Sequence, residues 1–344
     1  MNFLDTIFEA TGISYVMELF GKEKDPEENQ ESNKENFYLK EHKPIKFNYR
    51  PQWLNDYISQ NNAKLLINLL LKEIMEIGKI RHIIISGTRG HGKTTLGKII
   101  SNHLGFEFNY FISNAFTKDN LKDFLIKNEE AKIPQVLMLD EVHGLDPELI
   151  EFFYPILEDM QLPNSNINLR NFVVICATTE LDYLQRKYPP FIDRMVNIQL
   201  EPYKAEDIKQ ILKKYNEQVY KKDISEEVFD ILACNGRYNP RTSILLFDLY
   251  IASGNVDIVL KCNRIIKNGL TSQDLSILEH LQQTKKPVGC DTLAIIGHTD
   301  TETYKTLIEP YLIQENLISK LARGRILLSK GEELLRSLNE KILL

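Results

Sequence analysis

One ten-residue stretch has the residue types and spacing of a phosphate-binding loop. It runs from Ser86 to Thr95 and fits the pattern G-x-x-x-x-G-K-[ST]. Glycines let backbone N–H groups close around phosphate oxygens, and a helix N-terminus adds partial positive charge. In this pattern the Lys93 ammonium reaches the β- and γ-phosphates, and the Thr94 hydroxyl binds Mg²⁺. The nucleotide-binding residues predicted from the loop are Gly87, Gly90, Gly92, Lys93, Thr94 and Thr95.

Two adjacent carboxylates form a second candidate group. Asp140 and Glu141 end the apolar run of residues 135–139, which predicts a buried strand. Ligands of parallel sheets lie beyond the carboxyl ends of the strands. We therefore expect Asp140 to hold Mg²⁺, usually through water, and Glu141 to accept a proton from the attacking water as the general base.

The elements around these residues predict an α/β fold with a mainly parallel sheet. Strands alternate with helices along the first two hundred residues, as in layered α/β domains. Strands are expected at residues 82–85, 106–110, 135–139, 172–177 and 195–201, and helices at 62–77, 96–104, 121–126 and 147–159. The strand at 172–177 ends in Thr178 and Thr179. A threonine there either contacts the attacking water or the γ-phosphate, or caps the next helix.

Two smaller units follow the sheet region. Residues 202–268 have only helical patterns, with helices expected at 205–220, 226–234 and 240–253. Arg241 places a fixed positive charge at the start of the last of these helices. From residue 269, three further helices and two short strands around a basic turn predict a winged helix, a variant of the helix-turn-helix class. The helices are expected at 272–283, 291–296 and 301–315.

Composition excludes several classes of protein. The hydrophobic fraction of 43% and the charged fraction of 26% are ordinary for a globular protein, and no apolar run approaches the roughly 20 residues that span a bilayer. The N-terminus lacks the features of a signal peptide, and the four widely spaced cysteines are typical of free thiols, so a cytoplasmic location is expected. The net charge of −6 argues against a protein coated in positive charge but leaves room for a local DNA-binding patch.

The N-terminal residues allow two interpretations. Residues 2–21 carry two apolar clusters at helical spacing, and residues 22–36 form a polar stretch typical of a flexible linker. The leading segment is either a tethered helix that docks on a partner or a helix packed on its own domain.

Several segments together are similar to those of a known family. They are Tyr49-Arg50-Pro51-Gln52-Trp53-Leu54, Asp140-Glu141-Val142-His143, the block 154–162, Ala177-Thr178-Thr179, Pro287-Val288-Gly289, the block 309–314 and Arg323-Gly324-Arg325. Through them the chain resembles, over about residues 47–335, the RuvB family, the AAA+ motors that drive branch migration of Holliday junctions. It implies an AAA+ P-loop ATPase domain at 41–201, a helical lid at 202–268 and a winged-helix DNA-binding domain at 269–344. Residues 1–40 are expected to form a separate N-terminal helix and flexible linker.

The resemblance also implies roles for individual residues. Thr179 is similar to the sensor 1 residue, Arg241 to sensor 2, and Arg194 to the arginine finger that acts on ATP bound by a neighbouring subunit. The catalytic residues expected in this way are Lys93, Asp140, Glu141, Thr179, Arg194 and Arg241. Tyr49, Arg50 and Tyr203 are expected near the nucleotide, and Lys320, Arg323 and Arg325 on a wing that contacts the DNA backbone. A finger that acts between subunits implies a homo-oligomer, by resemblance a hexameric ring.

Two departures from the family bear on partners. The long β-hairpin with which the family grips its partner RuvA is reduced to residues 163–171, which argues against a RuvA-type partner. The first 40 residues have no family counterpart, so another partner is expected to bind through residues 1–36. A smaller departure is Ile192, where the family usually has a second arginine.

The expected function is that of an ATP-dependent motor on branched or duplex DNA. The alternative is an AAA+ switch or loader that assembles on DNA or on a protein without moving junctions. A P-loop enzyme acting on a small molecule is disfavoured by the expected arginine finger and winged helix.

Overall fold

The computed structural model describes residues 49–160 and 172–342, without the side chains of residues 339–342. Residues Tyr49–Leu344 form one compact unit. The expectations for the N-terminal segment 1–40 and for the shortened hairpin at 163–171 lie outside the described residues.

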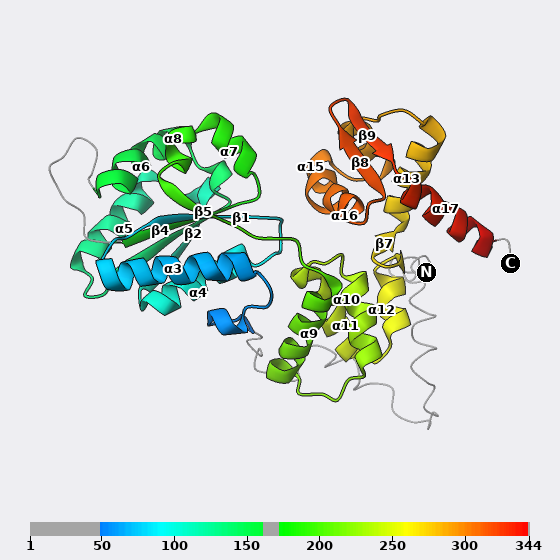
Figure 1. The fold of residues 1–344 in the computed structure, drawn as a ribbon, viewed down its shortest axis with the longest axis horizontal. Helices are drawn as coiled ribbons and strands as arrows, with labels where there is room; N and C mark the ends of the chain where they lie inside the picture. The colour runs from blue at the N-terminus through cyan, green and yellow to red at the C-terminus, as the bar shows by residue number, and fades with distance from the viewer. Residues whose placement is uncertain (1–48, 161–171, 343–344) are drawn as a thin grey trace, which may run out of the picture. The chain divides into compact units, whose positions relative to one another are not determined.

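A five-stranded parallel sheet carries the phosphate-binding loop, with the strand order β2-β3-β4-β1-β5 (Figure 1). The strands are β1 (His82–Ser86), β2 (Glu107–Ile112), β3 (Gln135–Asp140), β4 (Phe172–Thr178) and β5 (Met195–Gln199). The expected α/β fold is thus confirmed. Because all five strands run in the same direction, the residues that follow β1, β3 and β4 meet at one edge of the sheet.

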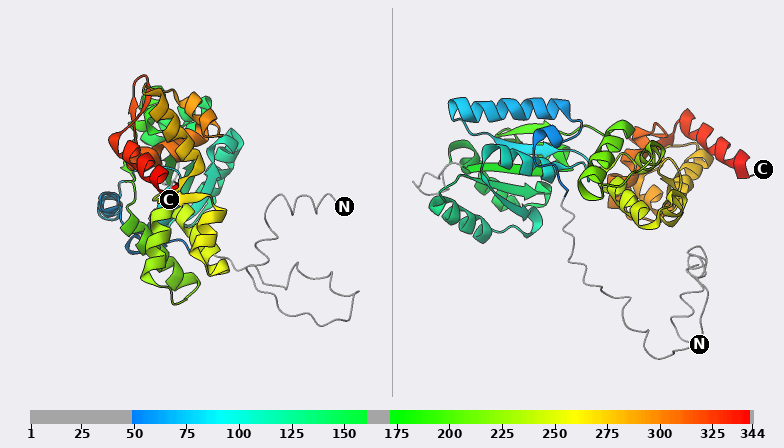
Figure 2. Two further views of the ribbon diagram at one scale, coloured as in Figure 1. Left: turned by 90° about the vertical axis from the view of Figure 1, so that its right-hand side faces the viewer. Right: turned by 90° about the horizontal axis from the view of Figure 1, so that it is seen from below.

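Helices cover both faces of this sheet. Ile83 and Ile85 of β1 pack with α3 (Asn61–Ile77) and α4 (Lys93–Leu104), whereas Ile84 faces the opposite layer. Figure 2 shows α3, drawn in blue, on one side of the sheet. The opposite layer and the connections contain α5 (Lys118–Glu130), α6 (Pro147–Asp159), α7 (Leu181–Lys187), α8 (Pro189–Ile192) and the 3₁₀ turns η1 (Leu54–Asp56), η2 (Ser113–Ala115) and η3 (Val142–Gly144). Burial on both faces explains why β1, β3 and β4 have continuous apolar runs.

The lid is a helical module around Phe247, which is fully buried and stacks on Phe229 with ring centroids 5.6 Å apart. Its helices are α9 (Ala205–Val219), α10 (Glu226–Asn235), α11 (Pro240–Ser253) and α12 (Val256–Cys262). Asn239 caps α11 by accepting hydrogen bonds from two backbone N–H groups, and Pro240 occupies the first turn, where its missing N–H costs nothing. A short hairpin of β6 (Ile265–Lys267) and β7 (Leu270–Thr271) leads out of the lid.

The C-terminal unit is a winged helix with its own apolar core. It contains α13 (Ser272–Thr284), α14 (Cys290–Ile296), α15 (Thr301–Thr303), the π-helical turn η4 (Tyr304–Ile308), α16 (Glu309–Gln314), strands β8 (Ile318–Leu321) and β9 (Gly324–Leu327), and α17 (Ser329–Ile342). The helix expected over 301–315 is interrupted by the π-helical turn, and α17 was not anticipated. None of the helices in the described ranges is long and apolar enough to cross a membrane.

The wing is attached to the segment before α14 through Val288. The backbone N–H groups of Val288 and Arg325 each donate to the other residue's carbonyl, at 3.0 and 2.8 Å. Between them the backbone approaches so closely that a Cβ atom on Gly324 would lie 2.6 Å from the Val288 carbonyl oxygen. The φ angle of Gly324 is 145°, which also disfavours a side chain.

Replacing this glycine should therefore destabilise the winged helix. We expect Gly324→Ala to cost about 1–3 kcal/mol, as overpacking commonly does, and to lower the temperature of a calorimetric unfolding transition. Gly289→Ala is the matched control, since its added Cβ meets nothing within 4 Å. Equal unfolding temperatures for the two variants would contradict the close approach at Gly324.

Candidate nucleotide-binding site

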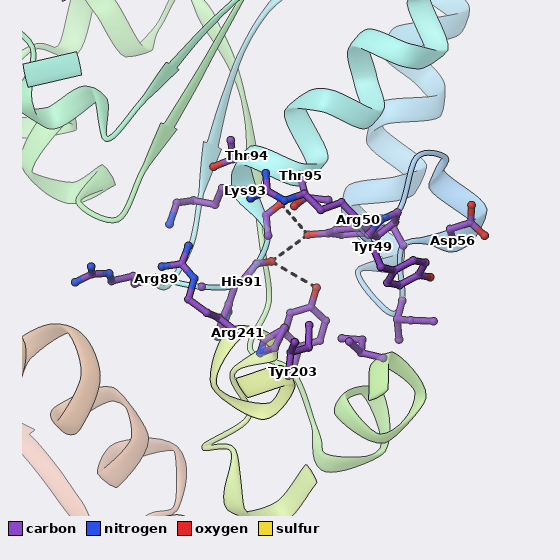
Figure 3. A pocket seen from close by; sticks show the side chains of 18 of the residues that line it. Tyr49, Arg50, Asp56, Arg89, His91, Lys93, Thr94, Thr95, Tyr203 and Arg241 are labelled. Atoms are coloured by element: carbon purple, nitrogen blue, oxygen red, sulfur yellow. Dashed lines mark hydrogen bonds between the residues drawn. The ribbon is translucent and has the colours of Figure 1, made fainter. Parts of the chain in front are cut away.

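A cavity of about 600 Å³ lies where the phosphate-binding loop meets the lid (Figure 3). Its size is within the usual range for small-molecule sites. The cavity brings together most of the residues expected from the sequence: Tyr49, Arg50, Gly90, Gly92, Lys93, Thr94, Thr95, Asp140, Glu141, Tyr203 and Arg241. Because its walls come from residues 49–58 (the N-terminal arm), the sheet edge and the lid, the site exists only in the folded chain.

The loop is held in a conformation that requires glycine. Gly90 and Gly92 have φ angles of 83° and 87°, in the left-handed region. A Cβ atom on Gly90 would lie 2.5 Å from the Asn239 side-chain oxygen, and one on Gly92 would lie 2.8 Å from the Tyr57 hydroxyl. Tyr57 also donates a hydrogen bond to the His91 carbonyl at 3.0 Å. The loop is therefore fixed from both sides by side chains distant in sequence.

Lys93 lies over this loop at the start of α4. Its ammonium donates to the carbonyls of Gly87 at 2.9 Å and Thr88 at 3.2 Å. Lys93 is only 6% exposed, and burial lowers its pKa, against the pull of the nearby Glu141 and Asp140 carboxylates. A buried ammonium with few partners favours an anionic ligand, as the phosphate groups of a nucleotide would be.

The two residues expected to bind a metal ion are in direct contact. The Thr94 hydroxyl donates to Asp140 Oδ2 at 2.8 Å. Hydroxyl and carboxylate oxygens are the hard ligands that Mg²⁺ prefers, so the donor set fits this ion. Tyr110, on β2, also donates to Asp140 Oδ2, at 3.1 Å. Sequence reasoning missed Tyr110, because its proximity to Asp140 depends on β2 lying beside β3 in the sheet.

Glu141 has an unusual backbone and a partly exposed carboxylate. Its φ angle of 51° is left-handed, which costs a non-glycine residue about 1–3 kcal/mol and is most often found at functional sites. Its Oε2 accepts a hydrogen bond from the Thr179 hydroxyl at 3.3 Å and lies 3.5 Å from His143 Nδ1. The Thr178 hydroxyl instead accepts from the Glu180 backbone N–H at 2.9 Å. Thr179 thus faces the candidate base, whereas neither threonine caps α7, whose N-cap is Glu180 without a side-chain cap bond.

The lid closes the cavity through three side chains. The Asn239 amide donates to the Arg89 carbonyl at 2.8 Å, while its oxygen accepts from the Arg241 backbone N–H at 3.0 Å. The Tyr203 hydroxyl, 2% exposed as a residue, donates to the His91 carbonyl at 3.5 Å. Arg241 lines the cavity beside them. The sequence does not predict this role of Asn239, since its contact with the loop spans 150 residues.

Arg194 does not line the cavity. Its guanidinium donates to Glu158 Oε2 from Nε at 2.9 Å and to the Pro190 carbonyl from Nη1 at 2.6 Å, and it lies 5.4 Å from the centre of the Tyr154 ring. These contacts hold the side chain against α6 and α8, and Arg194 is not among the residues that line the cavity of its own chain.

The wing presents two of its three expected DNA-binding side chains to solvent. Lys320 and Arg323 are exposed. Arg325 is 8% exposed, and its Nε donates to Glu309, itself 4% exposed. The Glu309 carboxylate raises the pKa of Arg325 further. The expectation that Arg325 contacts DNA is therefore corrected, because its guanidinium is committed to a buried ion pair inside the winged helix.

Two buried histidines predict acid sensitivity. Burial lowers the pKa of His82 and of His91 to about 4, and for His91 the nearby Lys93 adds to the effect. Unfolding lets each histidine regain a proton below its ordinary pKa of 6.5, so this share of stability is present above pH 6.5 and is lost as the pH falls toward 4.

Among the described residues, His91 Nδ1 has no hydrogen-bond partner, so leucine can replace this ring without orphaning another group. Between pH 7 and pH 4.5 we expect the free energy of unfolding to fall by about 1–3 kcal/mol less in His91→Leu than in the wild type. Urea denaturation across this range measures the difference. Parallel pH profiles for the two proteins would contradict the buried neutral histidine.

Comparisons with known proteins agree with this geometry. Residues 49–200 match the family model of the Holliday junction DNA helicase RuvB P-loop domain, and residues 267–336 match the RuvB C-terminal winged helix domain. The chain is 31% identical over 307 residues to the Holliday junction branch migration complex subunit RuvB of Mycoplasmopsis pulmonis, covering 82% of this chain and 96% of that protein. It is 27% identical over 310 residues to the same subunit of Ureaplasma urealyticum, covering 84% of this chain and 96% of that protein.

Solved structures of RuvB proteins are also similar to this chain. The structure described as the Thermotoga maritima RuvB Holliday junction branch migration motor is similar with a TM-score of 0.71 at 27% identity, over 83% of this chain and 98% of that one. A mutant of the same protein is similar with a TM-score of 0.72. The chain belongs to the RuvB family.

Proposed function

We propose that this protein is an ATP-dependent motor that drives branch migration of Holliday junctions or related branched DNA. The observation that carries the proposal is the cavity in which the phosphate-binding loop, two carboxylates and the lid meet, in a chain whose winged helix exposes basic side chains. The relatives named as branch migration subunits support the same function.

The roles within the cavity follow from the contacts. Lys93 contacts the β- and γ-phosphates of ATP, and Glu141, oriented by Thr179, accepts the proton of the attacking water. Thr94 and Asp140 hold Mg²⁺. Bound there, the ion would supply positive charge to the phosphate oxygens. Tyr49, Arg50 and Tyr203 surround the rest of the nucleotide, and Arg241 reports the state of the γ-phosphate to the lid.

The active form is a homo-oligomer, most simply a hexameric ring. Arg194 lies outside the cavity of its own chain, and an arginine in this role must reach ATP bound by a neighbour. Before assembly Glu158 and Tyr154 hold its guanidinium.

The wing binds the DNA backbone through Lys320 and Arg323, whose exposed charges favour phosphates without reading bases.

We propose that a RuvA-type partner is dispensable and that an unidentified partner binds through residues 1–36. The protein acts on DNA in the cytoplasm. The proposed division is 1–40, 41–201, 202–268 and 269–344 for the N-terminal segment, ATPase domain, lid and winged helix.

The role of Arg194 can be tested by mixing variants. We expect Arg194→Ala to bind ATP but hydrolyse it on the order of 10³-fold more slowly, since the finger is missing from every site. Glu141→Gln should bind ATP without hydrolysis. Mixing the two should restore part of the ATPase rate, because some sites then pair an intact Glu141 with an intact Arg194 from the next subunit.

The matched control for this experiment is Arg186→Ala, which removes an exposed arginine of α7. It should hydrolyse ATP at the wild-type rate. Normal hydrolysis by Arg194→Ala would refute action between subunits.

The motor function is tested on a synthetic four-way junction without any accessory protein. We expect strand movement with ATP for the wild type and none for Glu141→Gln, since movement depends on hydrolysis. Intact ATPase activity without movement would favour the alternative of a switch or loader, whose partner would then be sought with residues 1–36.

A further inference from the structure

Five consecutive residues after α10, the last two of them in α11, touch both the phosphate-binding loop and the winged helix. The segment 237–241 reads Arg-Tyr-Asn-Pro-Arg. Its last three residues belong to the nucleotide side, where Asn239 bonds the Arg89 carbonyl at 2.8 Å and Arg241 lines the cavity. Its first two residues are not part of the nucleotide site, and their contacts lead in the other direction.

Arg237 is bound into the start of the winged helix. Its Nε donates to the Gly269 carbonyl at 2.8 Å, and its Nη2 donates to the Asp274 carboxylate and to Thr271 Oγ1. The side chain of Asp274 is fully buried and also caps α13 by accepting from the Thr271 backbone N–H at 2.6 Å. The guanidinium lies 4.9 Å from the centre of the Tyr311 ring. A planar cation held by a buried carboxylate and an aromatic face has little freedom to turn.

Tyr238 adds a second connection. Its hydroxyl donates to Glu315, at the end of α16, and its ring packs against the apolar cores of both the lid and the winged helix. Burial and the Glu315 carboxylate raise the pKa of Tyr238, so the hydroxyl remains a donor at all ordinary pH values. Gln314, next to Glu315, donates to the Tyr203 carbonyl at 3.1 Å and thereby ties the winged helix to the start of the lid as well.

The backbone of this segment is strained at Arg237 and Tyr238, the two residues whose side chains contact the winged helix. Arg237 and Tyr238 have φ angles of 55° and 52°, both left-handed in residues other than glycine. Two such residues in succession persist only when surrounding contacts over-determine the conformation. Here the polar contacts of both side chains lead to the winged helix or the segment that opens it, while the Tyr238 ring also packs on the lid core.

We propose that residues 237–241 are a coupling element, in which Arg237 and Tyr238 are positioning residues that fix the winged helix to the lid. The lid and the winged helix then turn as one body when Asn239 and Arg241 respond to the nucleotide. The coupling rests on the proposed motor function, whereas the rigid attachment does not. Without the attachment the lid would still respond to ATP, but its motion would not reach DNA.

The attachment is tested first, by distance measurement without DNA. Spin labels are introduced as Gln218→Cys on α9 and Glu302→Cys on α15, both exposed, after replacement of Cys234, Cys262 and Cys290 by serine. We expect one narrow distance distribution in the full-length protein, unchanged between ADP and a non-hydrolysable ATP analogue. Arg237→Gln should broaden it at least about twofold. An equally narrow distribution in Arg237→Gln would overturn the proposal.

Two further variants separate this role from general stability. Tyr238→Phe keeps the ring but removes the bond to Glu315, and should broaden the distribution less than Arg237→Gln does. Arg264→Gln is the matched control, because Arg264 also has a left-handed backbone, at 56°, while its side chain makes no hydrogen bond or ion pair within the described part of the chain. It should leave the distribution unchanged, and broadening by Arg264→Gln would overturn the proposal.

The coupling is tested on the four-way junction. We expect Arg237→Gln to hydrolyse ATP within about twofold of the wild-type rate, while junction movement per ATP hydrolysed falls about tenfold. A merely structural residue would lower binding, hydrolysis and movement together, and that result would overturn the coupling. If the wild type itself moves no junction, the motor function fails, and the distance measurement still decides whether the two units are one body.

Discussion

The phosphate-binding loop can close only where Gly90 and Gly92 adopt left-handed angles and leave room for side chains from distant parts of the chain. Tyr57 fills the space beside Gly92, and Asn239 fills the space beside Gly90. Each of these residues also bonds the backbone of the loop or a neighbouring residue. The loop is therefore the point at which the N-terminal arm, the sheet and the lid are joined. Because these parts are closely packed around it, a ligand bound in the loop affects the packing of all three.

Buried charges fix the arrangement of the parts that surround the loop. Arg325 and Glu309 pair within the winged helix, and Arg237 and Asp274 pair between the lid and the winged helix. Such pairs repay their desolvation only in one geometry, so they contribute orientation more than stability. Lys320 Nζ lies 3.9 Å from Glu309 Oε2, but its side chain is 61% exposed, and Arg323 is exposed as well, so both charges remain available to phosphates. Burial thus separates the basic side chains that hold the fold from those that can bind DNA.

The edge of the sheet brings together polar side chains from segments that are far apart in the sequence. Asp140 meets Thr94 from the loop helix and Tyr110 from the neighbouring strand, while Glu141 meets Thr179 from the far side. The parallel strand order β2-β3-β4-β1 accounts for all of these encounters. The chain turns sharply after β3, and this turn requires the unfavourable left-handed backbone of Glu141.

The amino-acid sequence by itself determined the local parts: the loop from its glycines and lysine, the strands from their apolar runs, the carboxylates that end β3, and the winged helix from its pattern of helices and strands. These features depend on residues close together in the chain, so periodicity and motif spacing reveal them. Tertiary structure alone decided which side chains meet. Tyr110 beside Asp140, Asn239 against the loop, Arg194 on Glu158 and Arg325 inside the winged helix all depend on strand order and packing between segments 30 to 150 residues apart, or on which way a hairpin side chain turns. Pattern reasoning placed Arg325 with its exposed neighbours because a basic turn looks the same whether an arginine finds water or a buried carboxylate, and only the folded position of Glu309 distinguishes the two.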